Sequence, residues 1–232
     1  NKAITLKYVT DGMHRPMSFF KSVRIGLIGL LYSALTPSST GGQPVQIMFM
    51  RKMGIPTGTA TSAMVVKFMA FQASVCFLFA MAVLVKFVFV VNTLANELVV
   101  IGIGFIINLL VLAAAISMMR KNAITKFAHK LLNFLHRIRL IKNLEKARAS
   151  WDKTLEDFHS GMAAIRQIKS RIWILCVMVS IQMLFQFAIT YFIYRACGLS
   201  SFTAVDIVCL QAILFLSVEY LPIRSEEHTS EL

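Results

Sequence analysis

The stretch LYSALTPSSTGGQPVQIMFMRK, residues 31–52, contains a run of proline, serine, threonine, glycine and glutamine between two apolar segments. If both segments are helical, Ile25–Thr36 is about 18 Å long and Val45–Met50 is about 9 Å long. Neither length crosses a hydrocarbon core of about 30 Å. The stretch therefore predicts either a surface loop between two small elements, or a helix that is broken inside a membrane with its exposed backbone turned toward something polar.

The composition favours the membrane. Of the 232 residues, 57% are hydrophobic and 15% are charged, whereas soluble domains have about 45–50% apolar and about 25% charged residues. Four apolar runs approach the roughly 20 residues that span a bilayer, namely Met69–Val91, Leu98–Met119, Ile172–Tyr194 and Ala204–Ile223. We therefore predict an all-α, polytopic helical membrane protein with about four spanning helices. Residues 1–223 are expected to form a single membrane domain.

The two ends of the chain point to a fragment. The sequence begins at Asn1 without a signal-peptide pattern, so we expect the true start to lie further upstream. The last nine residues, Arg224–Leu232, read RSEEHTSEL, which is similar to a translated sequencing adapter. We interpret residues 224–232 as a non-native tail, with a genuine polar tail as the alternative. On the first interpretation the natural protein continues past Ile223.

The basic residues predict an orientation. Residues 120–171 contain 13 Lys and Arg but only 4 Asp and Glu. The positive-inside rule places such a segment in the cytoplasm. Alternation of the spans then places the turns after Val91 and after Tyr194 outside, and the basic N-terminal segment inside. We predict a multi-pass protein of a bacterial plasma membrane.

On this topology both flanks of the opening stretch are basic and cytoplasmic. The simplest arrangement is a re-entrant pair, residues 25–50, that enters and leaves the membrane on the same side with PSSTGGQP at its tip. The rival arrangement is a single broken helix that spans the membrane and leaves Arg51 and Lys52 outside.

The cytoplasmic segment, residues 120–171, is patterned as two amphipathic helices with a break near Asn143–Ser150. Their apolar faces consist of Phe127, Leu131, Phe134, Leu135, Ile138 and Ile141, and of Trp151, Leu155, Phe158, Met162, Ile165 and Ile168. The helices either pack as a hairpin on the ends of the spanning helices, or lie at the interface and gather anionic phospholipid through their Lys and Arg face.

The broken stretch carries the first candidate site. Irregular backbone at membrane depth occurs only where it is buried in protein or lines an aqueous cavity. Pro44 suits the first position of a new helix, with Gln43 before it as a cap. Gly41 and Gly42 let the chain turn and let a ligand approach the backbone. The free N–H groups and the dipole of this half-helix would favour an anion such as phosphate. The alternative is a purely structural kink.

Charged side chains near the break extend the candidate site. Lys67 and Arg51 could supply positive charge near the cytoplasmic mouth, although both also suit snorkelling anchors. Glu219 is a candidate because charge at membrane depth is costly, and an interfacial position or an ion pair with another helix explains it equally. The complete candidate set for lipid or anion binding is Thr36, Pro37, Ser38, Ser39, Thr40, Gly41, Gly42, Gln43, Pro44, Gln46, Arg51, Lys67 and Glu219.

For the other polar residues in the spans we predict structural roles. Gln182 and Gln186 are four residues apart on one helix face, and we expect them to hydrogen-bond a neighbouring helix, with a ligand as the alternative. The same applies to Gln72 and Asn108. Lys86 lies close to the predicted outer boundary, where we expect it to snorkel.

Catalytic and metal-binding motifs are absent from the sequence. There is no HExxH pair, nucleophile elbow, P-loop or GxGxxG, and the four cysteines contain no CxxC pair. We therefore predict no catalytic residue, no metal site and no cofactor. A nucleic-acid partner is not expected either.

The region LTPSSTGGQPVQIMFMRKMGIPTGTATSAMVVKFMAFQ, residues 35–72, resembles the integral membrane region of the lysylphosphatidylglycerol synthase family, which includes flippase-like proteins. The resemblance covers most of residues 15–223, including the proline- and glycine-rich break, RKMGIP after it, the central basic helices and LFLSVEYLPI. Members often have an acidic residue after the paired glycines. This chain has Gln43 there, which argues against a proton-coupled or cation-binding role at that position.

The resemblance implies a membrane protein that binds or translocates phospholipid, or a related lipid-linked anion, between leaflets. The partner would be an anionic phospholipid. The alternative is the membrane anchor of a phosphatidylglycerol lysyltransferase whose soluble catalytic domain lies outside these residues. Four spans and a hairpin are few for a complete translocation path, so further helices or a second copy in a homo-oligomer would be needed.

Overall fold

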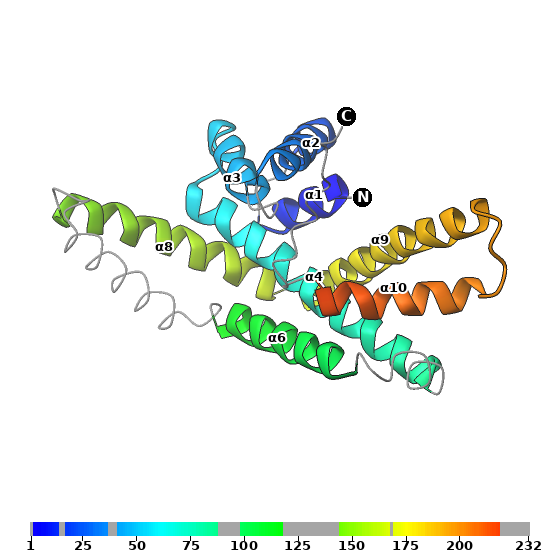
Figure 1. The fold of residues 1–232 in the computed structure, drawn as a ribbon. Helices are drawn as coiled ribbons and strands as arrows, with labels where there is room; N and C mark the ends of the chain where they lie inside the picture. Colours follow the sequence, from blue (N-terminus) through cyan, green and yellow to red (C-terminus); the bar gives the residue numbers. More distant parts are fainter. Residues whose placement is uncertain are drawn as a thin grey trace, which may run out of the picture.

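The computed structural model describes residues 2–13, 17–36, 41–87, 98–117, 144–167 and 169–218. The regular elements in these ranges are all α-helices, so the predicted all-α class is confirmed (Figure 1). In chain order they are α1 (Lys2–Gly12), α2 (Phe19–Leu35), α3 (Gly42–Lys52), α4 (Thr57–Val85), α6 (Leu98–Ser117), α8 (Leu144–Gln167), α9 (Lys169–Ala196) and α10 (Ala204–Val218).

Three of these helices, α4, α6 and α9, are long and apolar enough to cross a membrane. A shorter apolar helix covers Ala204–Ser217 within α10. Helix α6 begins at Leu98 as predicted, and α9 contains the predicted span Ile172–Tyr194. The chain is therefore a polytopic helical membrane protein. The predicted span 204–223 is described only as far as Val218.

Helix α4 differs from the predicted span. It begins at Thr57 rather than Met69, and it ends at Val85 rather than Val91. The early turns were missed because they contain threonine, glycine and serine, which lower the local hydropathy. Several of these small and polar side chains are buried against protein. At the other end Lys86 has a φ of −128° and is the C-cap of the helix.

Helix α4 forms the centre of the molecule. It packs against α1, α3, α6, α8, α9 and α10, and in Figure 1 it runs through the middle of the assembly of helices. The Phe79 ring on α4 stacks on Phe105 of α6 with 4.9 Å between ring centroids. Phe71 meets the edge of Phe215 of α10 at 6.1 Å. The core is thus built along both faces of one long helix.

Helix α8 packs along the N-terminal part of α4. Phe158 and Met162 on its predicted apolar face are buried. Gly58 of α4 touches α8 so closely that an added Cβ would lie 2.6 Å from the Phe158 nitrogen. This helix therefore packs on a spanning helix, which is the first of the two predicted arrangements. The other predicted amphipathic helix lies outside the described residues.

Helix α8 begins inside the range Asn143–Ser150, in which a break between two amphipathic helices was predicted. Helix α8 begins at Leu144 and continues without interruption through residue 150. The reason is that LEKARAS, residues 144–150, consists mainly of good helix formers. No described residue between 144 and 150 breaks the helix.

The chain directions agree with the predicted alternation of spans. The C-terminal ends of α4 and α9 lie at the same end of the molecule as the N-terminal ends of α6 and α10 (Figure 1). Consecutive apolar helices therefore run in opposite directions. Which end faces the cytoplasm stays a prediction.

Polar side chains connect the central helix to its neighbours. Cys76 Sγ of α4 donates to Asn108 Oδ1 of α6 at 2.8 Å, which confirms the predicted helix-to-helix role of Asn108. Lys86 Nζ forms an ion pair with Asp206 Oδ1 of α10 at 2.8 Å. Thr203, just before α10, donates its hydroxyl to Asp206 Oδ2 at 2.6 Å. Lys86 was expected to snorkel, and it pairs instead because α10 begins beside it.

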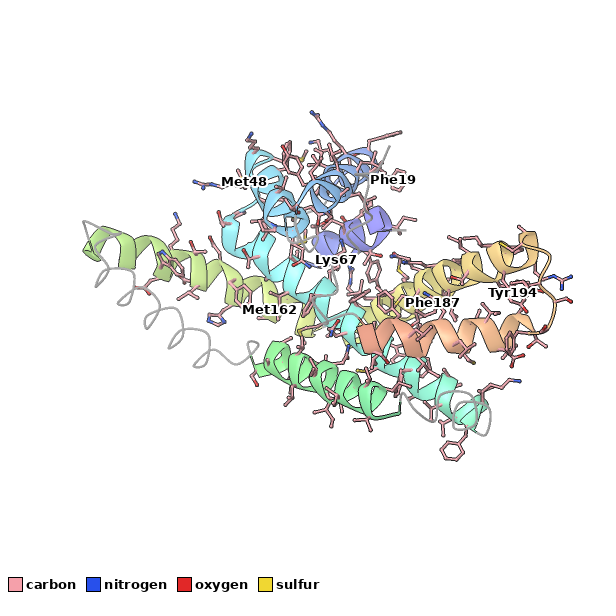
Figure 2. All side chains as sticks on the ribbon, in the orientation of Figure 1. Phe19, Met48, Lys67, Met162, Phe187 and Tyr194 are labelled. Atoms are coloured by element: carbon pink, nitrogen blue, oxygen red, sulfur yellow. The ribbon has the colours of Figure 1, made fainter. Side chains whose placement is uncertain are left out.

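The outer faces of several helices are apolar. On α2, Phe20 is 81% exposed, Leu27 is 60% exposed and Leu35 is 70% exposed. Figure 2 places Phe19 and Met48 at the outside of α2 and α3, whereas Lys67 lies among the helices. Contiguous exposed apolar surface of this kind marks contact with a membrane or another protein.

Candidate functional site

The two short helices α2 and α3 pack antiparallel against each other. Gln46 of α3 lies over Gly29 of α2, and its Nε2 donates to the Ile25 carbonyl oxygen at 3.3 Å. Gly42, one turn earlier in α3, contacts Ser33, later in α2. Residues of increasing number in α3 therefore contact residues of decreasing number in α2. This geometry favours the predicted hairpin over a broken helix that continues in one direction.

Glycine permits the close approach of the two arms. A Cβ added to Gly42 would lie 2.6 Å from the Gly29 carbonyl oxygen and would collide with the Ser33 hydroxyl. A backbone carbonyl cannot move aside as the end of a flexible side chain can. Any larger residue at Gly42 must therefore push α3 away from α2.

The turn between the arms is held by Thr36. Its hydroxyl donates to the Tyr32 carbonyl oxygen at 2.7 Å and accepts from the Gly41 N–H at 2.9 Å. One side chain thus joins the end of α2 to the start of α3. Residues 37–40 between these points, which include four predicted site residues, lie outside the described residues.

The start of α3 differs from the prediction. The helix begins at Gly42 with Gly41 as its cap, rather than at Pro44 with Gln43 as its cap. The first i→i−4 bond runs from the Val45 N–H to the Gly41 carbonyl at 3.3 Å. The N–H groups of the first helical turn have no partner within the helix in any case. Proline is therefore tolerated at the third position, and Pro44 does not determine where the helix starts.

The end of α3 follows from RKMGIP. Gly54 has a φ of +85°, a conformation that favours glycine. The Gly54 N–H bonds to the Arg51 carbonyl at 3.0 Å, and the Ile55 N–H bonds to the Met50 carbonyl at 3.1 Å. This is a Schellman motif, which closes the helix and redirects the chain. Helix α4 then begins directly after Pro56.

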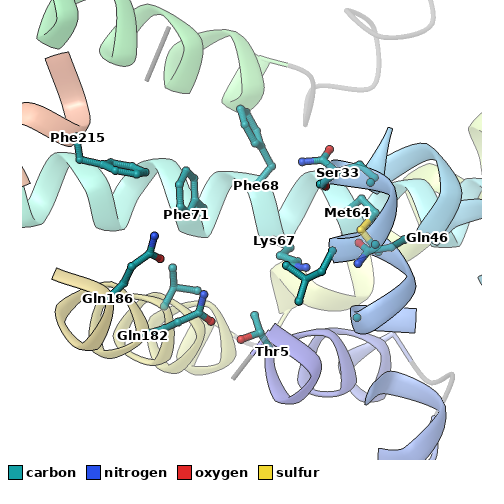
Figure 3. Close-up of a pocket in the computed structure, with 16 residues that line it drawn as sticks. Thr5, Ser33, Gln46, Met64, Lys67, Phe68, Phe71, Gln182, Gln186 and Phe215 are labelled. Atoms are coloured by element: carbon teal, nitrogen blue, oxygen red, sulfur yellow. The ribbon is translucent and has the colours of Figure 1, made fainter. Parts of the chain in front are cut away.

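The hairpin opens onto a cavity of about 370 Å³ (Figure 3). Six helices contribute to it: α1, α2, α3, α4, α9 and α10. The lining residues are Thr5, Gly26, Gly29, Leu30, Ser33, Gly42, Gln43, Gln46, Met64, Lys67, Phe68, Phe71, Val179, Gln182, Gln186 and Phe215. The cavity therefore combines amides, hydroxyls and one lysine with three aromatic rings.

Lys67 of α4 lies at the centre of this arrangement. Figure 3 shows its side chain between Gln46 on α3 and Gln182 on α9. The residue is ten positions into α4, so it lies about 15 Å along the helix from the Thr57 end. Lys67 therefore lies on the cavity wall, and its place near a cytoplasmic mouth stays a prediction.

Gln182 and Gln186 face the cavity from α9 (Figure 3). We had predicted that they bond a neighbouring helix. Both residues line the cavity, and their hydrogen bond to a neighbouring helix stays a prediction.

The predicted site residues fall into three groups. Gly42, Gln43, Gln46 and Lys67 line the cavity. Thr36, Gly41, Pro44 and Arg51 do not line it, with Thr36 and Gly41 forming the turn and Arg51 exposed in the last turn of α3. Pro37, Ser38, Ser39, Thr40 and Glu219 lie outside the described residues.

Sequence reasoning missed several lining residues. Ser33 lies on the same face of α2 as Gly26 and Gly29. Small residues recurring every three or four positions mark a close helix contact in membranes, so this face could have been found from spacing. Thr5 of α1, Phe71 and Phe215 gave no such signal because only the tertiary fold brings α1, α4 and α10 together.

The described lining of the cavity combines polar and apolar groups. Within the ranges that the structure covers, no three His, Cys, Asp or Glu side chains gather in a way that could hold a metal ion. The cavity groups are hydrogen-bonding amides and hydroxyls, a cation and apolar rings. A ligand with an anionic polar part and an apolar part would match them.

A comparison with known proteins found a matching family. The family model described as "Lysylphosphatidylglycerol synthase TM region" matches residues 2–223. A similar protein from Archaeoglobus fulgidus, described as a UPF0104 membrane protein, is 28% identical over 223 residues, which cover 93% of this chain and 66% of that protein. The chain thus spans slightly less than two thirds of that relative's length. No solved structure matches the chain.

Proposed function

This chain belongs to the lysylphosphatidylglycerol synthase transmembrane family, and from that premise we propose that it binds a phospholipid or a related lipid-linked anion and moves it between leaflets. The observation that carries the proposal is the cavity beside the α2–α3 hairpin, which joins the glycine-rich break to Lys67 and to the amides of α9. Its volume of about 370 Å³ lies within the range of ligand sites, roughly 300–1,000 Å³.

The polar wall supports recognition of an anionic headgroup. Lys67 supplies a cation, and charge-assisted hydrogen bonds to phosphate are stronger than neutral ones. Gly42 and Gln43, at the start of α3, bring a helix N-terminus to the same wall. The backbone N–H groups and the dipole there favour an anion. The two features reinforce each other because they face one cavity.

The apolar wall supports recognition of the rest of the lipid. Phe68 and Phe71 of α4 and Phe215 of α10 line the cavity. Phe215 also contacts Phe187 of α9, with ring centroids 5.7 Å apart. Rings of this kind would contact the glycerol backbone and the first carbons of the acyl chains, while the headgroup meets the amides.

We further propose that the α2–α3 hairpin is re-entrant from the cytoplasmic side of the plasma membrane. Its arms, of 17 and 11 residues, are about 26 Å and 17 Å long, so neither spans the bilayer alone. Exposed leucines on α2 provide a surface for lipid contact. Residues 120–171 would then be cytoplasmic. Six neighbouring helices are few for a full path, so a second copy or helices beyond this chain would complete it.

Cysteine labelling tests this orientation. Cys197, in the turn after α9, is exposed and should react with a membrane-impermeant maleimide from outside intact cells. With the other native cysteines replaced, Lys21→Cys and Lys52→Cys should both react only from the cytoplasmic side. Labelling of Lys52→Cys from the side that labels Cys197 would contradict the re-entrant hairpin.

The transport proposal is tested by a matched pair of glycine variants. Gly42→Ala forces α3 away from α2, whereas Gly102→Ala on α6 enters open space. We expect Gly42→Ala to lower the movement of fluorescent phosphatidylglycerol between leaflets of reconstituted vesicles, and Gly102→Ala to leave it unchanged. Equal transport by both variants, at equal amounts of folded protein, would contradict the proposal.

A second function follows from the family's description, which names a synthase. On this alternative the chain is the membrane anchor of a phosphatidylglycerol lysyltransferase, with catalysis in a further domain. The full reading frame distinguishes the two. A soluble domain of several hundred residues after the helices would favour the enzyme, and an end after a few more helices would favour the stand-alone transporter.

A further inference from the structure

Resting on the proposed function, we infer that the rings of Phe187 on α9 and Phe215 on α10 form the barrier of the transport path, which opens when Phe215 moves. The inference begins with a second cavity, of about 130 Å³, between α4, α9 and α10. Its described lining consists of aliphatic side chains, Met81, Phe187 and the thiol of Cys209, without a charged or amide group. It therefore suits the hydrocarbon part of a lipid, whereas the first cavity also has polar groups.

Both cavities lie along one face of α4. The first is lined by Met64 and Phe71, and the second by Leu78 and Val85. These four residues are seven positions apart, which is close to two helical turns, so their side chains project to nearly the same side. From Met64 to Val85 the helix rises about 32 Å. The two cavities together therefore follow α4 over about the thickness of a hydrocarbon core, roughly 30 Å.

Aromatic rings lie between the two cavities. Phe215 lines the first cavity, Phe187 lines the second, and their ring centroids are 5.7 Å apart. Phe71 of α4 meets the edge of the Phe215 ring at 6.1 Å, and Figure 3 shows these two rings next to each other. Aromatic rings at such separations are in favourable contact. Side chains from three helices therefore close the passage between the polar cavity and the apolar one.

The two rings of the barrier differ in their freedom to move. Phe187 is 2% exposed and belongs to the hydrophobic core. Phe215 is only partly buried and borders the open space of the first cavity. A rotation of Phe215 can use this space, whereas a rotation of Phe187 would have to displace close-packed neighbours. Phe215 is therefore the movable part of the barrier.

The second cavity reaches the surface of the molecule at its other end. Val85 and Val205 line it, and they are 56% and 51% exposed. They adjoin Lys86 and Asp206 in the chain, whose ion pair joins α4 to α10. A lipid that passes the rings would therefore move from the cavity that contains Lys67 to an exit beside this ion pair.

Cys209 provides a native reporter of the barrier, because it lines the second cavity and is only 7% exposed. The test uses the full chain in vesicles, with the substitutions Cys76→Ser, Cys176→Ala and Cys197→Ser. A charged, membrane-impermeant methanethiosulfonate is added from each side in turn. Cys209 should react far more slowly than Cys197 does in a chain that keeps only that cysteine. Phe215→Ala should raise the rate by about threefold to tenfold, as the loss of one or two ring contacts would give.

Transport is measured in the same vesicles as the movement of fluorescent phosphatidylglycerol between leaflets. Phe215→Ala should speed this movement by about threefold to tenfold as well. Phe215→Trp, which enlarges the ring, should slow both the transport and the labelling. Partial unfolding would change both variants in the same direction, so opposite changes at one position report the barrier itself.

Phe105→Ala on α6 is the matched control. Phe105 is also partly buried and also contacts a ring of α4, that of Phe79 at 4.9 Å, but it lines neither cavity. This variant loses the same kind of ring contact without opening the passage. It should leave the labelling of Cys209 and the transport unchanged.

The labelling and the transport separate the inference from the proposed function. Labelling of Cys209 in the native chain as fast as that of Cys197 would overturn the inference, because the rings would then be no barrier. The inference also fails if Phe215→Ala changes neither rate, or if Phe105→Ala raises both rates equally. If the native chain moves no lipid, the proposed function fails, and the labelling alone then decides whether the rings separate the cavities.

Discussion

Two lysines, Lys67 within α4 and Lys86 at its C-cap, have different surroundings. Lys86 follows the last residue of α4 and forms a 2.8 Å ion pair with Asp206, which also accepts hydrogen bonds from Thr203. Lys67, within the helix, lines a cavity with amides, hydroxyls and aromatic rings. The first lysine joins two helices, and the second faces a space that a ligand can enter. The comparison separates a lysine in a helix-to-helix ion pair from a lysine on the wall of a cavity.

The largest effect is expected from Lys67→Met, which keeps the length of the side chain and removes its charge. Transport of phosphatidylglycerol should fall by roughly tenfold to a hundredfold, because hydrogen bonds to charged groups contribute about 1.5–3 kcal/mol. The thermal unfolding midpoint should change little. Arg51→Met, an exposed cation outside the cavity, is the control and should keep transport. An equal loss of transport in both variants would show that transport depends on basic charge in general rather than on a cation in the cavity.

Lys86→Met should give the opposite result. It removes one partner of the ion pair and leaves Asp206, which is only 8% exposed, without its cation. We expect a lower unfolding midpoint with transport retained in the protein that stays folded. Lys86→Met/Asp206→Asn should recover part of the stability, since removing the cation alone leaves the mostly buried Asp206 carboxylate unpaired. An additive double variant would contradict a direct interaction.

The pH dependence of this pair has a defined sign. The hydrogen bond with Asp206 raises the pKa of Lys86 above its ordinary value of 10.5. A raised folded-state pKa means that the contribution of the pair is fully present below pH 10.5 and is lost at higher pH, as the folded lysine deprotonates. The difference in midpoint between the native chain and Lys86→Met should therefore stay constant from neutral pH to about pH 10 and shrink above it. A difference that already shrinks near pH 8 would contradict the assignment.

Local features of the fold could be predicted from the sequence because their causes are local. The break around Gly41 and Gly42 lies between two arms that are each too short to span the membrane. The structure has one helix on each side of it, α2 and α3. RKMGIP ends a helix because Gly54 adopts the left-handed conformation of a Schellman motif. Apolar length alone identified α6 and α9. These results depend on neighbours within a few residues in the chain.

The features that could not be predicted depend on residues far apart in the chain. Gln182 lies more than a hundred residues after Gln46, and only the packing of α9 and α3 around α4 brings them to one cavity. The same is true of Lys86 and Asp206, whose ion pair gives no local pattern. The start of α4 was missed for a related reason, because its polar first turns are covered by α8 rather than by lipid.

The smallest effect is expected at the cap of α10. Thr203 is the residue before the helix, its hydroxyl accepts from the Asp206 N–H at 3.3 Å, and its own N–H donates to Asp206 Oδ2 at 2.9 Å. This reciprocal pattern is a capping box. Thr203→Ala should lower the free energy of unfolding by about 1 kcal/mol, as the loss of a helix cap does. Thr203→Ser should retain most of that stability.

Ser117→Ala on α6 is the matched control for this cap, because its hydroxyl bonds only to the Ala113 carbonyl of its own helix, at 2.8 Å, in an exposed position. It should change stability by less than about 0.5 kcal/mol. Lys86→Met combined with Thr203→Ala should cost less than the sum of the two single variants, because both act on the Asp206 carboxylate. A strictly additive result would mean that Thr203 caps α10 without orienting Asp206 toward Lys86. The Thr203–Asp206 cap and the Lys86–Asp206 ion pair would then be two independent contacts. The structural role of Lys86, in contrast to Lys67, would then depend on the ion pair alone.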